Sequence, residues 1–219
     1  MNHVIVSSFD PITLIGGGEI AINDLTDSLA LAPILVACDG GAKAALDQNH
    51  EPIAVIGDMD SIDSATKDAI GADKLHVISE QESNDFEKAL MHCEAPVILG
   101  VGFTGTRLDH ELAAFGALLK FASKRIILIG KHDVVFLAPQ QLELNLPIGS
   151  RFSLFPMGAV RGTSEGLCWP IDGLEFAPEG RLGTSNEVNG PVRLTFEALK
   201  MLVILPREAL PEVMRALQT

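Results

Sequence analysis

The sequence predicts an N-terminal α/β domain with a doubly wound, mostly parallel sheet, followed by a small antiparallel β-sandwich or barrel. Three observations predict this arrangement. Short aliphatic runs alternate with helix-like stretches over residues 1–132, helical periodicity then disappears, and Gly and Pro divide the remainder into short segments. We therefore expect two domains in the 219 residues, covering 1–132 and 133–219.

The N-terminal strands are predicted where aliphatic residues run almost without interruption between glycine or charged residues. Such runs are typical of parallel sheets covered on both faces. Between them, Asp85–His92 and Leu108–Phe121 are predicted helices, because their apolar residues recur at helical spacing. The predicted strands are Thr13–Gly16, Ile34–Ala37, Ile53–Ile56, Leu75–Ile78, Val97–Leu99 and Ile126–Ile129.

The C-terminal strands are predicted from alternation and from the turn residues around them. In Leu142–Leu146, leucine alternates with Glu143 and Asn145, which is the period of a strand buried on one face. The last stretch, Pro206–Leu217, is expected to form a short helix. The predicted strands here are Val134–Leu137, Leu142–Leu146, Arg151–Phe155, Val192–Phe196 and Met201–Leu205.

Composition excludes several classes of protein. Asp and Glu total 29 against 16 Lys and Arg, and a net charge of -13 repels nucleic acid. No apolar run reaches the roughly 18 residues that span a bilayer, and the first residues lack a signal peptide's features. Cys38, Cys93 and Cys168 are widely spaced, which argues against a disulfide framework or a zinc site. We expect a cytoplasmic protein that binds neither nucleic acid nor membrane.

Aspartates follow four successive predicted strands. Asp39 comes after the second strand, Asp58 and Asp60 after the third, Asp85 opens the helix after the fourth, and Asp109 follows the fifth. Ligands of open α/β sheets bind beyond these carboxyl ends. Gathered carboxylates repel one another unless a cation compensates them, and Mg²⁺ prefers carboxylate and phosphate oxygens. The pattern predicts a magnesium site for phosphate chemistry, although each aspartate alone is more often a cap or turn residue.

Two features have competing interpretations. Gly16, Gly18 and Ala21 fit the dinucleotide fingerprint G-x-G-x-x-A, with Asp39 near the ribose position, which predicts an NAD-type enzyme. A glycine-rich turn that binds ATP phosphates rests on the same physics and also explains the other aspartates. Trp169, the sole tryptophan, has a ring that could stack on a ligand, but its setting in CWPIDG favours packing in the core or against a turn.

Seven segments resemble, in order, the motifs of the thiamine pyrophosphokinase family, and together they cover nearly the whole chain. The resemblance lies in the ordered set, since GDMDS or RLDH alone would be a weak signal. The segments are CDGGAKAAL, PIAVIGDMDSID, ESNDFEKAL, GFTGTRLDHELA, RFSLFPMG, GTSEGLCWPIDG and GRLGTSNEV.

The resemblance implies a diphosphate transfer from ATP to thiamine that depends on Mg²⁺. It also implies a homodimer whose active sites lie between the α/β domain of one subunit and the β domain of the other. The implied metal ligands are Asp58, Asp60 and Asp85, and the implied catalytic residues are these three with Arg107 and Asp109. The implied ATP contacts are Asp39, Gly40, Gly41, Gly105 and His110, and the implied aminopyrimidine contacts are Ser185 and Asn186.

The chain departs from the family pattern in two places. Asn84 stands where family members often have Thr, and Leu199–Leu202 lacks the aromatic that stacks on thiamine in animal members. Three alternatives stay open at this point: a pyrophosphokinase acting on a pterin alcohol, an NAD-type enzyme, and a non-catalytic protein that binds thiamine or a nucleotide.

Overall fold

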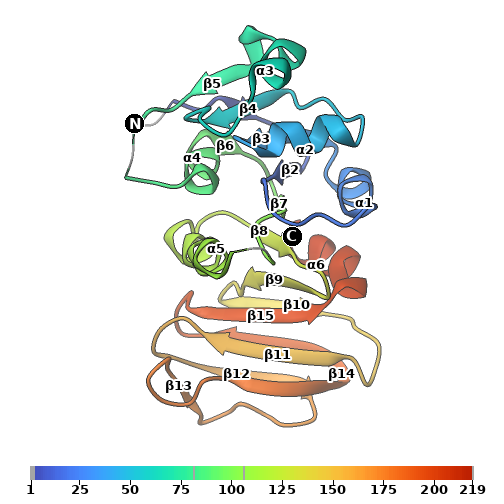
Figure 1. Cartoon of the computed structure of the whole chain (residues 1–219). Helices are drawn as coiled ribbons and strands as arrows, with labels where there is room; N and C mark the ends of the chain where they lie inside the picture. The colour runs from blue at the N-terminus through green and yellow to red at the C-terminus, as the bar shows by residue number, and fades with distance from the viewer. Residues whose placement is uncertain (1–2, 81, 106, 219) are drawn as a thin grey trace. The chain divides into compact units, whose positions relative to one another are not determined.

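The computed structural model describes residues 3–80, 82–105 and 107–218, and the chain divides into two compact units (Figure 1). The first unit runs to Ala117 and also contains Leu128–Lys131. The second contains Leu118–Ile127 and the chain from His132 onwards. Helix α5 (Leu108–Lys120) therefore contributes residues to both units, which the sequence pattern did not indicate.

The first unit is built on the predicted parallel sheet. Its five parallel strands lie in the order β7 (Ile98–Val101), β2 (Ile12–Ile15), β3 (Ile34–Cys38), β4 (Ala54–Gly57) and β5 (Leu75–Val77). Strand β8 (Ile126–Ile129) follows β7 in this order. Every residue of β2, β4 and β7 is buried, as expected for strands covered on both faces. The strand order reverses between β2 and β7, so a ligand crevice is expected there.

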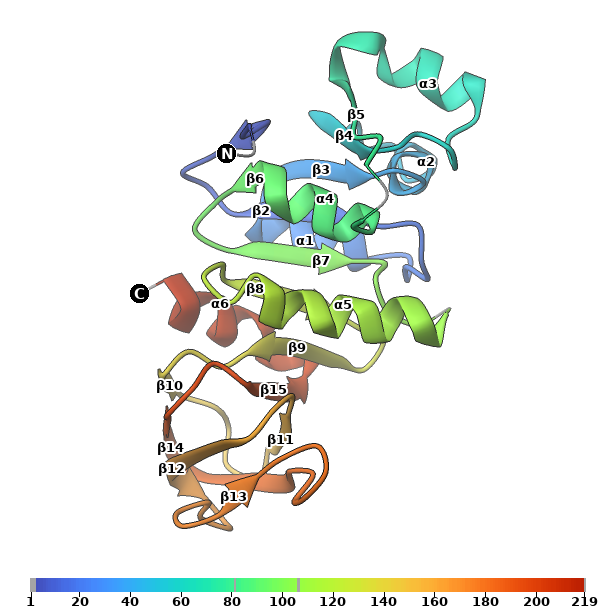
Figure 2. The same cartoon turned by 90° about the vertical axis from the view of Figure 1, so that its left-hand side faces the viewer.

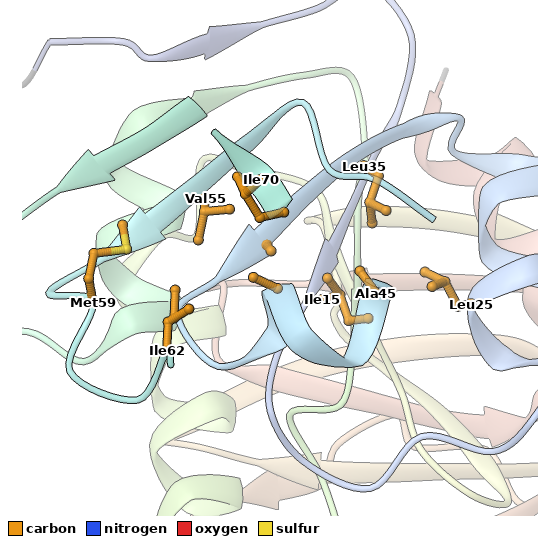
Figure 3. Packing of buried hydrophobic residues seen from close by; sticks show 10 residues of the cluster. Ile15, Leu25, Leu35, Ala45, Val55, Met59, Ile62 and Ile70 are labelled. Atoms are coloured by element: carbon orange, nitrogen blue, oxygen red, sulfur yellow. The ribbon is translucent and has the colours of Figure 1, made fainter. Parts of the chain in front are cut away.

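Helices cover both faces of this sheet. Figure 2 shows α4 (Asp85–His92) in front of the strands and α1 (Asp24–Leu31) behind them. On the α1 side, α2 (Gly41–Asp47) and α3 (Ser64–Ile70) complete an apolar cluster (Figure 3). Burying each large aliphatic side chain contributes about 1.5–3 kcal/mol. The cluster residues labelled in Figure 3 are Ile15, Leu25, Leu35, Ala45, Val55, Met59, Ile62 and Ile70.

The smaller elements of the first unit are β1 (Val6–Ser7), which pairs in parallel with β6 (Cys93–Glu94), and a 3₁₀ turn at Ala72–Lys74. Within the described part of the chain, no helix has the length and apolar character needed to cross a membrane.

The second unit is antiparallel, as the sequence predicted, and its long strand β14 (Thr184–Phe196) pairs with three others. These are β10 (Gln141–Leu144), β11 (Arg151–Pro156) and β12 (Val160–Leu167). Strand β15 (Met201–Pro206) joins β11 to β9 (Asp133–Leu137), and β13 (Glu175–Phe176) pairs with β12. The predicted C-terminal helix is present as a 3₁₀ turn (Arg207–Ala209) followed by α6 (Leu210–Gln218), which contacts β10.

Strand β12 was not predicted, and β14 is longer than its predicted segment. Strand β12 contains Gly162 and Gly166, and its register shifts between Glu165 and Leu167. Gly166 has φ +75°, and a Cβ there would lie 2.2 Å from the Pro191 carbonyl oxygen. The bulge forms because partner strands meet closely in space, which a pattern of single residues does not reveal.

Candidate active site

A pocket of about 490 Å³ opens at the carboxyl ends of β2, β3 and β7 in the first unit. It therefore lies where the strand order reverses. Gly16–Gly18 follow β2, Asp39 and Gly40 follow β3, and Gly102–Thr104 follow β7. Cys38 ends β3 and also lines the pocket, and the remaining lining residues come from the loop before α3, the start of α4, and the segment at α5: Ser61, Asn84, Asp85, Phe86, Arg107, His110, Ala113 and Ala114.

Two glycines determine how closely these strand ends approach one another. A Cβ at Gly41 would lie 2.1 Å from the Ile15 carbonyl oxygen, so only glycine lets the start of α2 reach β2. A Cβ at Gly57 would lie 2.8 Å from the Cβ of Asp39. Gly57 thus allows the loop after β4 to approach the loop after β3, and the aspartates of both loops come together.

The carboxylates of Asp39, Asp58 and Asp60 form one group, with an oxygen from each lying within 4.8 Å of the others. Asp39 is 3% exposed, and its Oδ2 accepts a hydrogen bond from the Ser61 amide at 3.3 Å. Its Oδ1 is buried without a hydrogen-bond partner. Such orphaned acceptors are rare in proteins, and a cation would satisfy this one. Three carboxylates, one of which has an oxygen without a hydrogen-bond partner, are a set of hard oxygen donors that fits Mg²⁺.

Asp39 is also the carboxylate whose ionisation the fold opposes. Burial raises the pKa of Asp39, and the negative charges of Asp85 and Asp60 raise it further, while hydrogen bonds from Ser61 lower it. At neutral pH the ionised Asp39 therefore costs stability in the absence of a cation, and protonation relieves that cost as the pH falls. Its backbone φ of +41° places it in the left-handed region, which aspartate tolerates better than most residues.

Lys88 lies beneath the carboxylates and was not predicted. Its side chain is 2% exposed, and its Nζ lies 3.2 Å from Asp58 Oδ2 and 3.2 Å from Asp85 Oδ1. Burial lowers the pKa of Lys88, but hydrogen bonds to Asp85 and Asp58 outweigh it, so the pKa lies above its ordinary value. The sequence does carry a signal for one of these ion pairs. Lys88, directly before Ala89, stands three residues after Asp85 in α4, and residues three apart are neighbours on the surface of a helix.

The loop that carries Asp58 and Asp60 has a second anchor. Lys67 of α3 donates from Nζ to the Met59 carbonyl at 2.8 Å, and Met59 has φ +65°. The Asp58 Oδ1 accepts the Asp60 amide at 3.3 Å. A carbonyl anchor and a buried side chain at Met59 thus fix the backbone between the two acidic residues.

Arg107 and Asp109 form an exposed ion pair with each other. The Arg107 Nη2 lies 2.6 Å from Asp109 Oδ2, and Nε donates to Oδ1 at 3.1 Å. This hydrogen bonding holds the pKa of Asp109 below its usual range. Arg107 and His110 line the pocket, whereas Asp109 does not join the carboxylate group found among the described residues. Gly105, with φ +100°, donates its amide to Glu111 at 3.3 Å.

The polar residues at helix starts have local roles. Asn84 accepts the Glu87 amide at 2.9 Å and caps α4, so the departure from Thr keeps a capping side chain. Asp63 caps α3 by accepting the Thr66 amide at 2.7 Å.

In the second unit, Asn186 is buried and its amide is bound to the backbone around Trp169. Its Oδ1 accepts the amides of Trp169 at 3.1 Å and Glu187 at 2.9 Å, and its Nδ2 donates to the Trp169 carbonyl at 2.6 Å. The Trp169 side chain is 61% exposed, so the prediction that it packs in the core is wrong. Asn186 holds the main chain of the turn, and the indole is left facing outward. Ser185 is exposed and pairs in register with Ser153.

The residues after Trp169 are braced in the same way. The Ser164 Oγ accepts the Ile171 amide at 3.0 Å, and the Ser164 amide donates to Asp172 Oδ2 at 3.3 Å. The exposed indole therefore belongs to a turn whose backbone is held by hydrogen bonds at Trp169 and again two to three residues later.

A doubly wound sheet with glycine-rich loops and a carboxylate group beyond the ends of β3 and β4 is typical of α/β enzymes that act on phosphates. Two family models match the chain. The thiamin pyrophosphokinase catalytic domain matches residues 25–129, and the vitamin B1 binding domain of the same family matches residues 140–200.

Curated relatives and solved structures agree with these matches. The thiamine pyrophosphokinase 1 of Oryza sativa subsp. japonica is 27% identical, over 76% of each chain. Among crystal structures, thiamin pyrophosphokinase from Geobacillus thermodenitrificans has a TM-score of 0.72 at 23% identity and covers 90% of this chain and 96% of its own. Yeast thiamin pyrophosphokinase has a TM-score of 0.75 at 15% identity and covers 97% and 94%.

The chain belongs to the thiamine pyrophosphokinase family, and its activity is that of a thiamine diphosphokinase. The fold class predicted from the sequence is confirmed by the parallel sheet, the β-rich C-terminal part and the likeness to these structures.

Proposed function

We propose that the chain uses Mg²⁺ to transfer the β,γ-diphosphate of ATP to the hydroxyl of thiamine, giving thiamine diphosphate and AMP. The observation that carries this proposal is the orphaned Asp39 Oδ1 within the group of Asp39, Asp58 and Asp60. Asp39 of this group lines a glycine-rich pocket in the unit that matches the family's catalytic domain. A pterin-alcohol kinase or an NAD-type enzyme has no comparable observation in its favour.

Asp39, Asp58 and Asp60 are the residues that would hold the metal. Bound there, Mg²⁺ would supply neutralisation of the phosphate charge. Asp85 was predicted as a third ligand beside Asp58 and Asp60. Its oxygen is bound to Lys88 in this structure, so we assign Asp85 a place beside the metal-holding group and not within it.

The ATP phosphates are proposed to bind along the glycine-rich strand ends. The backbone N–H groups at Gly40 and Gly41 offer donors, and Arg107 and His110 reach the pocket from the segment at α5. Gly105 gives this segment its turn, because its φ of +100° suits only glycine. Arg107 exchanges its pairing with Asp109 for a phosphate at small cost, since both side chains are exposed.

Proton transfer is assigned to Asp85. The O–H bond of thiamine breaks with its proton moving to the Asp85 carboxylate, the alkoxide oxygen bonds to the β-phosphorus, and the bond to the bridging oxygen of AMP breaks. Asp109 was predicted as an alternative. Its lowered pKa makes it a poorer proton acceptor while it is paired with Arg107. We retain Asp109 as the residue that orients Arg107.

The second unit is proposed to bind thiamine through Trp169. Its exposed indole offers a flat surface to the aminopyrimidine and the cationic thiazolium. This supplies the aromatic that Leu199–Leu202 lacks. Asn186, predicted as a direct contact, is then the residue that positions Trp169, and the exposed Ser185 keeps its hydroxyl for the ligand.

The assembly and location follow from the family resemblance and the cysteines. We propose a homodimer whose active sites combine the α/β domain (residues 1–132) of one subunit with the β domain (133–219) of the other. We also propose a cytoplasmic enzyme, since none of Cys38, Cys93 and Cys168 forms a disulfide.

The test is a discontinuous assay with ATP, Mg²⁺ and thiamine that resolves AMP, ADP and thiamine diphosphate by chromatography. We expect thiamine-dependent AMP in equal amount to thiamine diphosphate, and loss of both on chelation of Mg²⁺. Release of ADP would contradict diphosphate transfer. Turnover of a pterin alcohol without turnover of thiamine would favour the pterin alternative, and NAD binding without a need for Mg²⁺ would favour the dehydrogenase.

A further inference from the structure

Lys88 is a buried cation at a site that otherwise collects negative charge. Burying an ammonium group is costly unless it is paired with partners of opposite charge. Lys88 has two such partners on different elements, since Asp58 follows β4 and Asp85 opens α4. The helix α4 contacts β3 and β4, so the stem of Lys88 is held by the packing of α4 against the sheet.

The ammonium group of Lys88 lies between two carboxylate oxygens, which are the type of ligand that divalent cations prefer. Its Nζ lies between Asp58 Oδ2 and Asp85 Oδ1, at 3.2 Å from each. Two-metal sites that transfer phosphoryl groups place their ions about 3.5–4 Å apart, with a shared carboxylate a common arrangement. Here Asp58 belongs both to the Lys88 pair and to the carboxylate group with Asp39 and Asp60.

We propose that Lys88 is a built-in cation between Asp58 and Asp85, which confines the protein's own metal binding to one divalent ion on the Asp39–Asp58–Asp60 face. This inference rests on the magnesium site of the proposed function. Lys88 is a positioning residue, because it acts through the two carboxylates and does not line the pocket. Its ammonium group orients Asp58 toward the metal and Asp85 toward the reacting hydroxyl.

The test counts Mn²⁺ ions bound to the full chain without nucleotide, by electron paramagnetic resonance titration. We expect one Mn²⁺ per wild-type chain and two per chain of Lys88→Met, because the vacated space keeps both carboxylates. Lys88→Arg retains the charge and should keep one. Lys43→Met is the matched control, since Lys43 pairs with Asp47 on the exposed surface of α2 and neither residue belongs to the carboxylate group. It should also keep one.

Steady-state kinetics give the second measurement. The kcat of Lys88→Met should fall about 10–100-fold, the range for residues that orient metal ligands, with little change in the KM for thiamine. Lys88→Arg should recover most of the lost kcat. Lys88→Gln provides a second neutral variant if Lys88→Met does not fold.

The Mn²⁺ count separates the two proposals because it needs no turnover. An enzyme that makes thiamine diphosphate but already binds two Mn²⁺ in its wild-type form overturns the role of Lys88 and leaves the proposed function intact. A folded Lys88→Met or Lys88→Gln that still binds one Mn²⁺ does the same. A wild-type chain that binds no Mn²⁺ overturns the metal site together with this inference.

Discussion

The carboxylate group of the first unit and the Trp169 turn of the second hold their functional side chains by different means. Around Asp39, charges are crowded, one buried oxygen lacks a partner, and a buried lysine offsets only part of the negative charge. Around Trp169, the Asn186 amide makes three hydrogen bonds to the backbone, and only the indole faces outward. The first arrangement is completed by a ligand, whereas the second is complete before a ligand arrives.

The largest expected effect is on the charged side of this comparison. Asp58→Asn or Asp60→Asn should lower kcat by about 1,000-fold, since several kcal/mol of charge stabilisation by the metal is lost. The variants should stay folded, because asparagine matches aspartate in shape and Lys88 keeps Asp85 as a charged partner when Asp58 is replaced. Assay of thiamine diphosphate formation at saturating Mg²⁺ checks this. Asp63→Asn is the matched control in the same loop and should turn over normally. Full activity in both variants would refute the metal assignment.

On the hydrogen-bonded side, Asn186→Ala should cost about 1–3 kcal/mol of unfolding free energy. It removes the side-chain partner of the Trp169 amide and carbonyl, which are partly buried. Urea unfolding monitored by circular dichroism measures the loss. Ser185→Ala, one residue away on the exposed face, should change stability by less than about 0.5 kcal/mol. Equal stability of the two variants would show that the amide bracing contributes little.

Trp169→Ala should separate binding from stability. Stacking on a cationic heteroaromatic ring is worth about 1–2 kcal/mol, so the KM for thiamine should rise about 10-fold. The melting temperature should hardly change because the indole is 61% exposed. Trp169→Phe should retain part of the affinity. A lowered melting temperature with an unchanged KM would indicate that the indole packs rather than binds.

The smallest expected effect concerns Asp39, whose buried carboxylate lacks a compensating cation in the metal-free chain. Asp39→Asn should stabilise the metal-free chain by about 1 kcal/mol at pH 7, as removal of strained charge at functional sites commonly does. The wild-type pKa is raised above the ordinary 3.8, so wild-type Asp39 protonates as the pH falls and its cost disappears. The stability difference should therefore shrink from pH 7 toward acidic pH in chelator. A difference that grows on acidification would contradict the raised pKa.

The parallel sheet and the aspartate positions were predictable because both depend on local pattern. Aliphatic runs mark strands buried on both faces, and the topology of such sheets gathers the residues at their carboxyl ends. Asp39, Asp58 and Asp60 lie in one group, whereas Asp85 pairs with Lys88 beside Asp58, and Asp109 pairs with Arg107.

Features that depend on contacts distant in sequence were missed. Lys88 is buried because Asp58, thirty residues earlier, supplies a charge that its own helix does not. Trp169 was assigned to the core from the general preference of tryptophan, but Asn186 holds its backbone with the ring outward. Strand β12 was hidden by its glycines, and only pairing with β14 makes it a strand.

Gly57 has a consequence for how this enzyme can evolve. It ends a buried strand, where alanine would suit the apolar surroundings, yet one added methyl would meet the Cβ of Asp39 at 2.8 Å. The absence of a side chain at this point therefore sets how closely the loop after β4 approaches the loop after β3. Selection at position 57 acts on the distance between carboxylates, so a relative with a larger residue there would need a compensating shift at position 39 to keep the same ion.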